Sequence, residues 1–176
     1  MLKKRMKTHN NTKYFPTRYW HKLDDGRVMC DLCPKYCCLR EGKRGSCYIR
    51  MCHQQKIVLT SYGRISGCAI DPIEKKPLFH YLPGAKVLSF GTAGCNLSCQ
   101  FCQNWRLSRS RQDSTLADTT TPQQLVEMAE ACHCQGIAFT YNDPVIFMEF
   151  AVDIARLAKK QGLKSVAVSA GYICAK

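Results

Sequence analysis

The second half of the chain alternates short apolar runs with longer amphipathic segments. Residues 87–90 are typical of a short buried strand, and residues 137–141 and 164–169 are also strand-like. Between them, 121–135 and 145–161 place apolar residues three and four positions apart, which is the period of an amphipathic helix. Strands that alternate with such helices predict an α/β fold with a parallel sheet, whose functional loops follow the carboxyl ends of the strands.

Capping signals place the ends of both predicted helices. Thr121 and Gln124 have the spacing of a capping box, and Pro122 suits the first helical position. We expect Gly136 to stop the first helix and Gly162 to cap the second.

The first half of the chain is patterned differently. Residues 56–68 alternate apolar and polar positions around Gly63, which predicts a β-hairpin, and a proline-containing linker follows at 71–84. Residues 27–53 hold six cysteines but few large apolar side chains, so we expect this segment to need a metal to fold. Residues 1–26 are polar and basic, and we expect an arm that docks by its scattered aromatic side chains.

These patterns divide the chain into three regions. We expect a basic arm at 1–26, a cysteine-rich module with its linker at 27–84, and the first part of an α/β barrel at 85–176. A length of 176 residues is short of the roughly 250 of a complete eight-unit barrel. The sequence therefore predicts a partial barrel of about three strand–helix units, either a truncated product or a fragment of a longer protein.

The cysteine content and the net charge are the two unusual features of the composition. Thirteen cysteines, an odd number without a signal peptide, argue against a secreted disulfide framework and predict a reducing, cytoplasmic compartment in which thiols bind metals. No run of about 20 apolar residues is present, so we expect no membrane partner. The net charge of +13 favours acidic partners such as nucleic acid, although basic residues at a chain end are commonly just solvated.

A loop with three cysteines, just after the run at 87–90, is the strongest chemical signal. Cys95, Cys99 and Cys102 are separated by three and then two residues. A tight loop with this spacing can aim three thiolates at one iron–sulfur cluster, whereas ferredoxin clusters take four protein thiolates. Three ligands leave one iron open to chelate a substrate. The alternative interpretation is a zinc knuckle.

A second cysteine set precedes the predicted hairpin. Cys30, Cys33 and Cys37 are closely spaced, and Cys47 follows after a glycine-containing return. Four thiolates in this pattern suit either a tetrahedral zinc site or a second iron–sulfur cluster. The sequence leaves the choice between these metals open.

The three-cysteine loop resembles the signature of the radical S-adenosylmethionine (SAM) superfamily, with Phe101 directly before Cys102. The resemblance implies that Cys95, Cys99 and Cys102 hold a [4Fe–4S] cluster whose fourth iron binds the methionine part of SAM. Reductive cleavage of SAM would then yield a 5′-deoxyadenosyl radical, with a flavodoxin or ferredoxin as the reductant. The resemblance also implies that Phe101 lies near the adenine.

Longer motifs resemble the AmmeMemoRadiSam radical enzyme family, a relative of the pyruvate formate-lyase activating enzymes. These motifs are Asp71-Pro72-Ile73-Glu74-Lys75-Lys76-Pro77-Leu78, Cys102-Gln103-Asn104-Trp105 and Thr140-Tyr141-Asn142-Asp143-Pro144. The resemblance implies that Asn142, Asp143 and Gly171 contribute to the cofactor site.

Two positions depart from that family's pattern. Asp143 stands where the family typically has a glutamate, which shortens the reach of the carboxylate by one methylene. Ser169 and Ala170 stand where Thr-Asn is expected, so an amide that could bind cofactor is lost. By spacing alone, Asp143 before Pro144 is equally typical of a helix N-cap.

Taken with the resemblance, the sequence predicts an oxygen-sensitive radical SAM oxidoreductase that activates a partner protein by hydrogen abstraction. Two alternatives stay open: radical-based modification of nucleic acid, and a non-catalytic module that uses both cysteine sets to bind zinc. Because a partial barrel leaves the radical exposed to quenching, we expect weak or uncoupled turnover of this chain.

Overall fold

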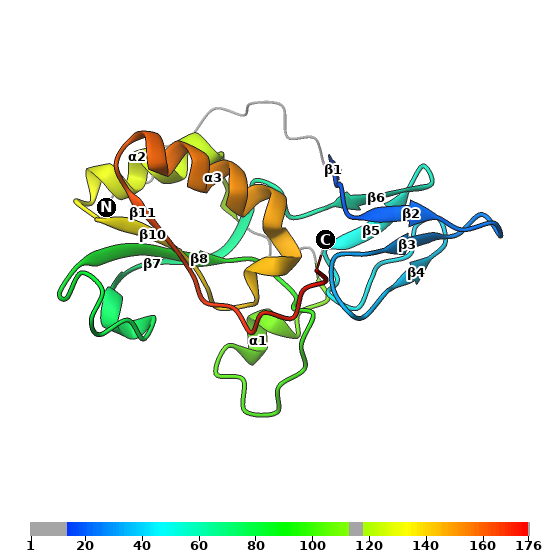
Figure 1. Ribbon diagram of the computed structural model, residues 1–176, viewed down its shortest axis with the longest axis horizontal. Helices are drawn as coiled ribbons and strands as arrows, with labels where there is room; N and C mark the ends of the chain where they lie inside the picture. Colours follow the sequence, from blue (N-terminus) through cyan, green and yellow to red (C-terminus); the bar gives the residue numbers. More distant parts are fainter. Residues whose placement is uncertain (1–13, 113–117, 176) are drawn as a thin grey trace.

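The computed structural model describes residues 14–112 and 118–175, so the first part of the predicted basic arm lies outside the described residues. In the described residues, one mixed sheet lies beside two small antiparallel sheets (Figure 1). The strands are β1 (Phe15–Pro16), β2 (Trp20–Lys22), β3 (Val28–Cys30), β4 (Cys38–Leu39), β5 (Arg50–His53), β6 (Lys56–Leu59), β7 (Arg64–Pro72), β8 (Lys86–Gly91), β9 (Asp118–Thr119), β10 (Gly136–Phe139) and β11 (Lys164–Ala167). The helices are η1 (Ile73–Lys75), α1 (Trp105–Ser108), α2 (Pro122–Ala131), η3 (Pro144–Phe147) and α3 (Met148–Lys160).

The large sheet has the strand order β11-β10-β8-β7-β9. Its β8, β10 and β11 run parallel, as the alternation of strands and helices predicted. β7 pairs antiparallel with β8, and β9 pairs antiparallel with β7. The sequence pattern predicted neither β9 nor the place of β7 in this sheet. The expected α/β class is therefore confirmed as a mixed α/β fold.

Helices α2 and α3 lie together over one face of this sheet (Figure 1). Because successive strand residues point to opposite faces, Leu88 and Phe90 of β8 pack under the helices while Val87 belongs to a second apolar cluster. Phe90 is fully buried, and its ring centroid lies 6.0 Å from that of Phe150 on α3 and 5.6 Å from that of Phe139 on β10. These aromatic contacts hold the helix layer against the parallel strands.

The helix ends follow the predicted capping signals with one exception. Thr121 and Gln124 form both hydrogen bonds of the capping box before α2. Gly162, with φ of +74°, follows Gln161, the C-cap residue of α3. Gly136 does not stop α2, because the helix already ends at Ala131. It begins β10 instead, where a Cβ atom would lie 2.5 Å from the Lys164 carbonyl oxygen of β11.

The predicted hairpin at 56–68 is wrong. Both segments are strands, but β6 lies between β1 and β5 in a small sheet, and β7 joins the large sheet. Both edges of β6 are therefore occupied, and the turn around Gly63 carries the chain from one sheet to the other. Tyr62 in this turn stacks on Phe15 and donates a 2.6 Å hydrogen bond to Asp153 of α3.

The cysteine-rich segment completes its small core with residues from outside it. Val28, Leu32 and Leu39 cluster with Ile57 of β6 and with Val145 of η3. The predicted lack of apolar side chains within the segment is therefore compensated by neighbouring elements. Among the described residues, no helix is long and apolar enough to cross a membrane.

Candidate functional site

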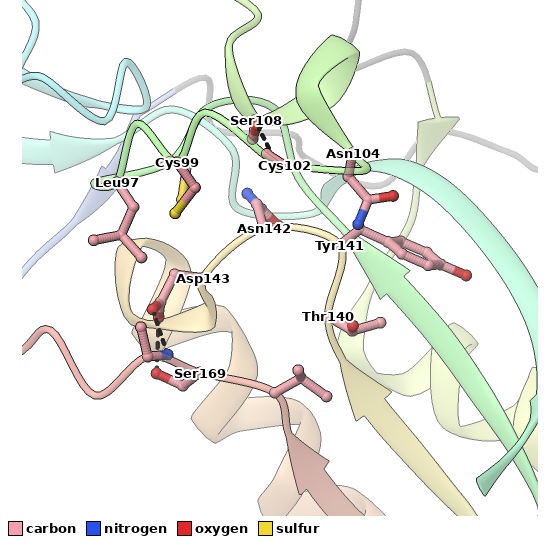
Figure 2. A pocket seen from close by; sticks show the side chains of 13 residues that line it. Leu97, Cys99, Cys102, Asn104, Ser108, Thr140, Tyr141, Asn142, Asp143 and Ser169 are labelled. Atoms are coloured by element: carbon pink, nitrogen blue, oxygen red, sulfur yellow. Dashed lines mark hydrogen bonds between the residues drawn. The ribbon is translucent and has the colours of Figure 1, made fainter. Parts of the chain in front are cut away.

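A cavity of about 340 Å³ lies at the carboxyl ends of β8, β10 and β11 (Figure 2). This is the edge of a parallel sheet at which ligands commonly bind. All three cysteines of the predicted cluster motif line it, together with the loops that follow the other two strands. The lining residues are Cys95, Leu97, Cys99, Cys102, Asn104, Ser108, Thr140, Tyr141, Asn142, Asp143, Val168, Ser169 and Ala170.

The three cysteines differ in exposure. Cys95 is buried, and burial raises the pKa of its thiol. Cys99 and Cys102 are half-buried, and the Cys102 Sγ lies 3.3 Å from the Oγ of Ser108, the last residue of α1. Three sulfur donors on one cavity wall fit an iron–sulfur cluster, which takes thiolates as ligands.

No group of three or more His, Cys, Asp or Glu side chains in the described ranges converges as it would around one metal ion. For Cys95, Cys99 and Cys102 this is compatible with a cluster, because each thiolate of such a site binds a different iron atom. The sulfurs of a cluster site are therefore more widely spaced than the ligands of a single ion. The residues present fit the cluster in donor type and in the size of the cavity.

Asn142 ties the loop after β10 to the loop after β8. Its Nδ2 donates to the Gly94 carbonyl oxygen at 2.8 Å and to the Thr92 Oγ1 at 3.0 Å, and its Oδ1 accepts from the Thr92 N–H at 3.1 Å. Gly91 allows this approach, since a Cβ there would lie 2.8 Å from the same Oδ1. The predicted cofactor residue Asn142 thus lines the cavity, but its side chain positions the segment that leads into Cys95.

Asp143 ties the loop after β10 to the loop after β11. Its Oδ1 accepts from the Ser169 hydroxyl and its Oδ2 from the Ala170 N–H, both at 3.0 Å (Figure 2). It is also the N-cap of η3, because its carboxylate accepts from the Val145 N–H. The N-cap interpretation is therefore correct, and Asp143 lines the cavity at the same time. Sequence reasoning did not foresee that Ser169 would bind this carboxylate.

A buried ion pair outside the cavity supports the same loop. Lys76 is 2.7 Å from Asp71, both side chains are buried, and the Tyr141 hydroxyl donates to the same Asp71 oxygen at 3.1 Å. Burial alone would raise the Asp71 pKa, but hydrogen bonds from Lys76 and Lys75 outweigh it and hold the pKa well below its usual range. Burial and the Asp71 charge raise the pKa of Tyr141 to about 12, so its hydroxyl keeps its proton. The motif that begins at Asp71 thus positions Tyr141, a role that sequence reasoning did not assign.

Two predicted cofactor residues do not line the cavity. Phe101 is 88% exposed and is not among the lining residues. Gly171 is exposed and has φ of +66°, and its N–H donates to the Ser169 Oγ. The structure therefore brings Asn142 and Asp143 together at the cavity and leaves Phe101 and Gly171 at its margin.

The second cysteine set is also brought together. Cys30, Cys33, Cys37 and Cys47 line one small cavity between the strands of the cysteine-rich segment. Burial raises the pKa of Cys30 to about 12 and also raises that of Cys47, while the guanidinium of Arg50 acts in the opposite direction on both.

Comparison with known proteins bears on the large cavity. Residues 90–174, which contain every residue that lines it, match the family model described as the Radical SAM superfamily. An uncharacterized protein of Methanocaldococcus jannaschii is 40% identical over 155 residues, which cover 88% of this chain and 46% of that protein. The chain thus spans about half the length of this curated relative. No solved structure matches this chain.

Proposed function

We propose, from the similarity of residues 90–174 to the radical SAM superfamily, that this chain is the cluster-binding part of a radical SAM enzyme. The observation that carries the proposal is the shared position of Cys95, Cys99 and Cys102 on one cavity wall, at the carboxyl ends of three parallel strands. We further propose that these strands form part of a partial barrel, with β11 at the edge where another strand would pair.

In this proposal, Cys95, Cys99 and Cys102 are the only protein ligands of a [4Fe–4S] cluster. A reduced cluster bound there would supply the electron that cleaves SAM into methionine and a 5′-deoxyadenosyl radical. The side chains of Leu97 and Val168 give the cavity an apolar wall, which limits the access of water to a reactive carbon radical.

Asp143 is the residue we propose for the amino group of SAM. A carboxylate has about four acceptor positions, and Val145, Ser169 and Ala170 occupy three of them. The remaining position can accept from an ammonium group in the cavity. Asn142 contributes by holding the cysteine loop, through Gly94 and Thr92, at a fixed distance from this carboxylate.

The rim beside the cysteine loop combines aromatic and basic side chains. Phe101 and Trp105 are exposed, and Arg106 and Arg109 are exposed next to them on α1 and at its end. We propose that Phe101 provides a stacking face for the adenine at this margin, with the Gly171 backbone opposite it. Exposed arginines also suit the acidic surface of a flavodoxin or ferredoxin that delivers the electron.

Anaerobic reconstitution with iron and sulfide tests the proposal. We expect about four iron atoms per chain at the large cavity, a reduced-cluster electron paramagnetic resonance (EPR) signal, and 5′-deoxyadenosine when SAM and dithionite are added. Cys99→Ala should abolish all three, whereas Cys132→Ala, which removes an exposed cysteine outside the cavity, should leave them unchanged. Wild-type protein that takes up no iron would refute the proposal.

For the acceptor of the radical we propose a partner protein that loses a hydrogen atom, as in the activating enzymes that the longer motifs resemble. The net charge of +13 favours nucleic acid as the alternative acceptor. Affinity for RNA or DNA measured over a series of salt concentrations separates the two. Two results together would favour nucleic acid over a partner protein. The affinity would fall steeply with salt, and a deuterated nucleic acid would transfer deuterium into 5′-deoxyadenosine.

A further inference from the structure

We infer that Cys30, Cys33, Cys37 and Cys47 bind a single zinc ion, and that this ion braces the loop that carries Cys95. The zinc site itself is independent of the proposed function, because its four cysteines lie outside the 340 Å³ cavity. The bracing role rests on the proposed function, since it concerns the loop of the proposed cluster.

The four cysteines come from two turns that face each other. Cys30 ends β3 and donates its N–H to the Cys37 carbonyl oxygen at 3.0 Å, which closes the first turn around Cys33. Cys47 lies in the second turn, in which the Gly45 carbonyl accepts from the N–H at position 48. The other residues around the cavity between them are Leu32, Gly45, Ser46, Arg50 and Ile146.

The size of this cavity favours one ion over a cluster. Its volume is about 10 Å³, against about 340 Å³ for the cavity at Cys95. A volume of roughly 10–15 Å³ holds one atom the size of a water oxygen. A tetrahedral zinc ion lies about 2.3 Å from each sulfur, so it needs no larger space. A [4Fe–4S] cluster would have to place eight atoms inside the same ring of cysteines.

Backbone N–H groups are directed at three of the four sulfurs. The Ser46 N–H donates to the Cys37 Sγ at 3.4 Å. The Leu32 N–H donates to the sulfur of Cys30, and the sulfur of Cys47 accepts from two backbone N–H groups that follow it in the chain. Donors of this kind stabilise thiolates and fix their orientation toward a metal.

Among the residues that the structure places, the four sulfurs are too far apart to bind one ion without a small movement of the two turns. Four thiolates repel one another without a cation between them, so the ion itself supplies the free energy that draws them together. Cys30, Cys33 and Cys47 are buried, and Cys37 is half-buried. Four thiolates are enough for a tetrahedral zinc site that leaves no coordination position open, which is typical of structural zinc.

The zinc site lies directly behind the proposed cluster loop. At Gly94, whose φ is +81°, a Cβ atom would lie only 2.1 Å from the Cys47 carbonyl oxygen. Arg111, beyond the same loop, donates to the Ser46 carbonyl oxygen at 3.1 Å. The loop after β11 rests on the first turn, because the Cys174 N–H donates to the Leu32 carbonyl oxygen at 3.0 Å. Fixing both turns around one ion therefore fixes the surface on which Cys95 is held.

Metal analysis of a variant without the proposed cluster ligands tests the zinc site alone. In the triple variant Cys95→Ala, Cys99→Ala and Cys102→Ala, we expect one zinc per chain and no iron, with four sulfur neighbours by X-ray absorption at the zinc edge. Iron and sulfide in this variant, or no metal, would overturn the inference. Failure of the proposed function has a different signature, which is wild-type protein that holds zinc but takes up no iron.

A matched pair of cysteine variants tests the ligand set. Cys33→Ser should lose the zinc, whereas Cys38→Ser should keep it, because Cys38 is exposed and does not line the small cavity. Full zinc content in Cys33→Ser would overturn the four-cysteine assignment. If Cys33→Ser is insoluble, Cys37→Ser, which changes the half-buried member of the set, takes its place: it too should lose the zinc, and full zinc content would overturn the assignment.

A matched pair of glycine variants tests the bracing. Gly94→Ala and Gly84→Ala place a Cβ at nearly the same positive φ, +81° and +76°, but only the first meets the Cys47 backbone. We expect Gly94→Ala to keep its zinc and lose most of its capacity for iron, while Gly84→Ala keeps both. Equal iron uptake by the two variants would overturn the bracing role.

Discussion

The Tyr141 hydroxyl donates a 3.1 Å hydrogen bond to Asp71, seventy residues earlier in the chain, and so joins the segment before η1 to the loop that lines the large cavity. The same carboxylate pairs with buried Lys76, whose ammonium lies 5.3 Å from the centre of the Tyr141 ring. The position of the loop after β10 therefore depends on a charge pair that lies outside the cavity.

Asp71→Asn should destabilise the fold by about 3 kcal/mol, because it leaves the buried Lys76 charge without its partner. The stabilising effect of Asp71 depends on pH. Since the folded-state pKa is depressed, the stabilisation is present above the unfolded value of about 3.9 and is lost as pH falls through the folded value. Urea unfolding of both proteins should show a difference at pH 7 that shrinks below pH 4. A difference that is constant with pH would contradict the assigned ion pair.

Arg50 and Glu149 form a second buried pair, between β5 and α3. The Arg50 Nη2 is 2.5 Å from the Glu149 Oε2, and the Arg50 Nη1 is 3.1 Å from the Oε1. Arg50→Met or Glu149→Leu alone should cost about 3–5 kcal/mol of unfolding free energy, because each leaves one buried charge. The double variant should recover much of that loss.

The control for these single and double variants is the exposed pair of Arg156 and Asp153, whose charged atoms lie 3.7 Å apart on α3. Removing it with Arg156→Met, which keeps Asp153 and its hydrogen bond from Tyr62, should cost at most about 1 kcal/mol. If the two pairs gave the same loss of stability, the pair of Arg50 and Glu149 would not act as a buried link between β5 and α3.

Asn142→Ala should reduce the amount of cluster that the protein holds. The substitution removes the three hydrogen bonds to Gly94 and Thr92 and leaves buried polar groups without partners, at a cost of about 1–3 kcal/mol each. We expect faster loss of iron to a chelator than in the wild type, with zinc unchanged. Iron loss at the wild-type rate would show that Asn142 does not position the cysteine loop.

Asp143→Asn separates SAM binding from cluster binding. An amide cannot accept from an ammonium group as a carboxylate does, so SAM affinity should fall about tenfold or more while iron content is retained. Ser169→Ala serves as the control, because it removes one hydrogen bond of Asp143 and keeps its charge. Equal SAM dissociation constants for Asp143→Asn and the wild type, measured by equilibrium dialysis, would exclude Asp143 as the contact.

Local sequence signals predicted the parallel strands, the capping box at Thr121 and the two cysteine sets. They failed where a tertiary contact decides the outcome. The alternation at 56–68 shows that two strands form but not that β6 and β7 find partners in different sheets. Likewise, no local pattern shows that Asn142 would bind Gly94, because the two residues are 48 positions apart.

EPR spectra of the reduced, reconstituted protein recorded with and without SAM test the central claim most directly. If Cys95, Cys99 and Cys102 leave one iron without a protein ligand, SAM should change the g values of the cluster signal, and methionine labelled with ¹⁷O or ¹⁵N in SAM should show hyperfine coupling to it. A cluster signal that SAM leaves unchanged, without coupling to the label, would contradict the account.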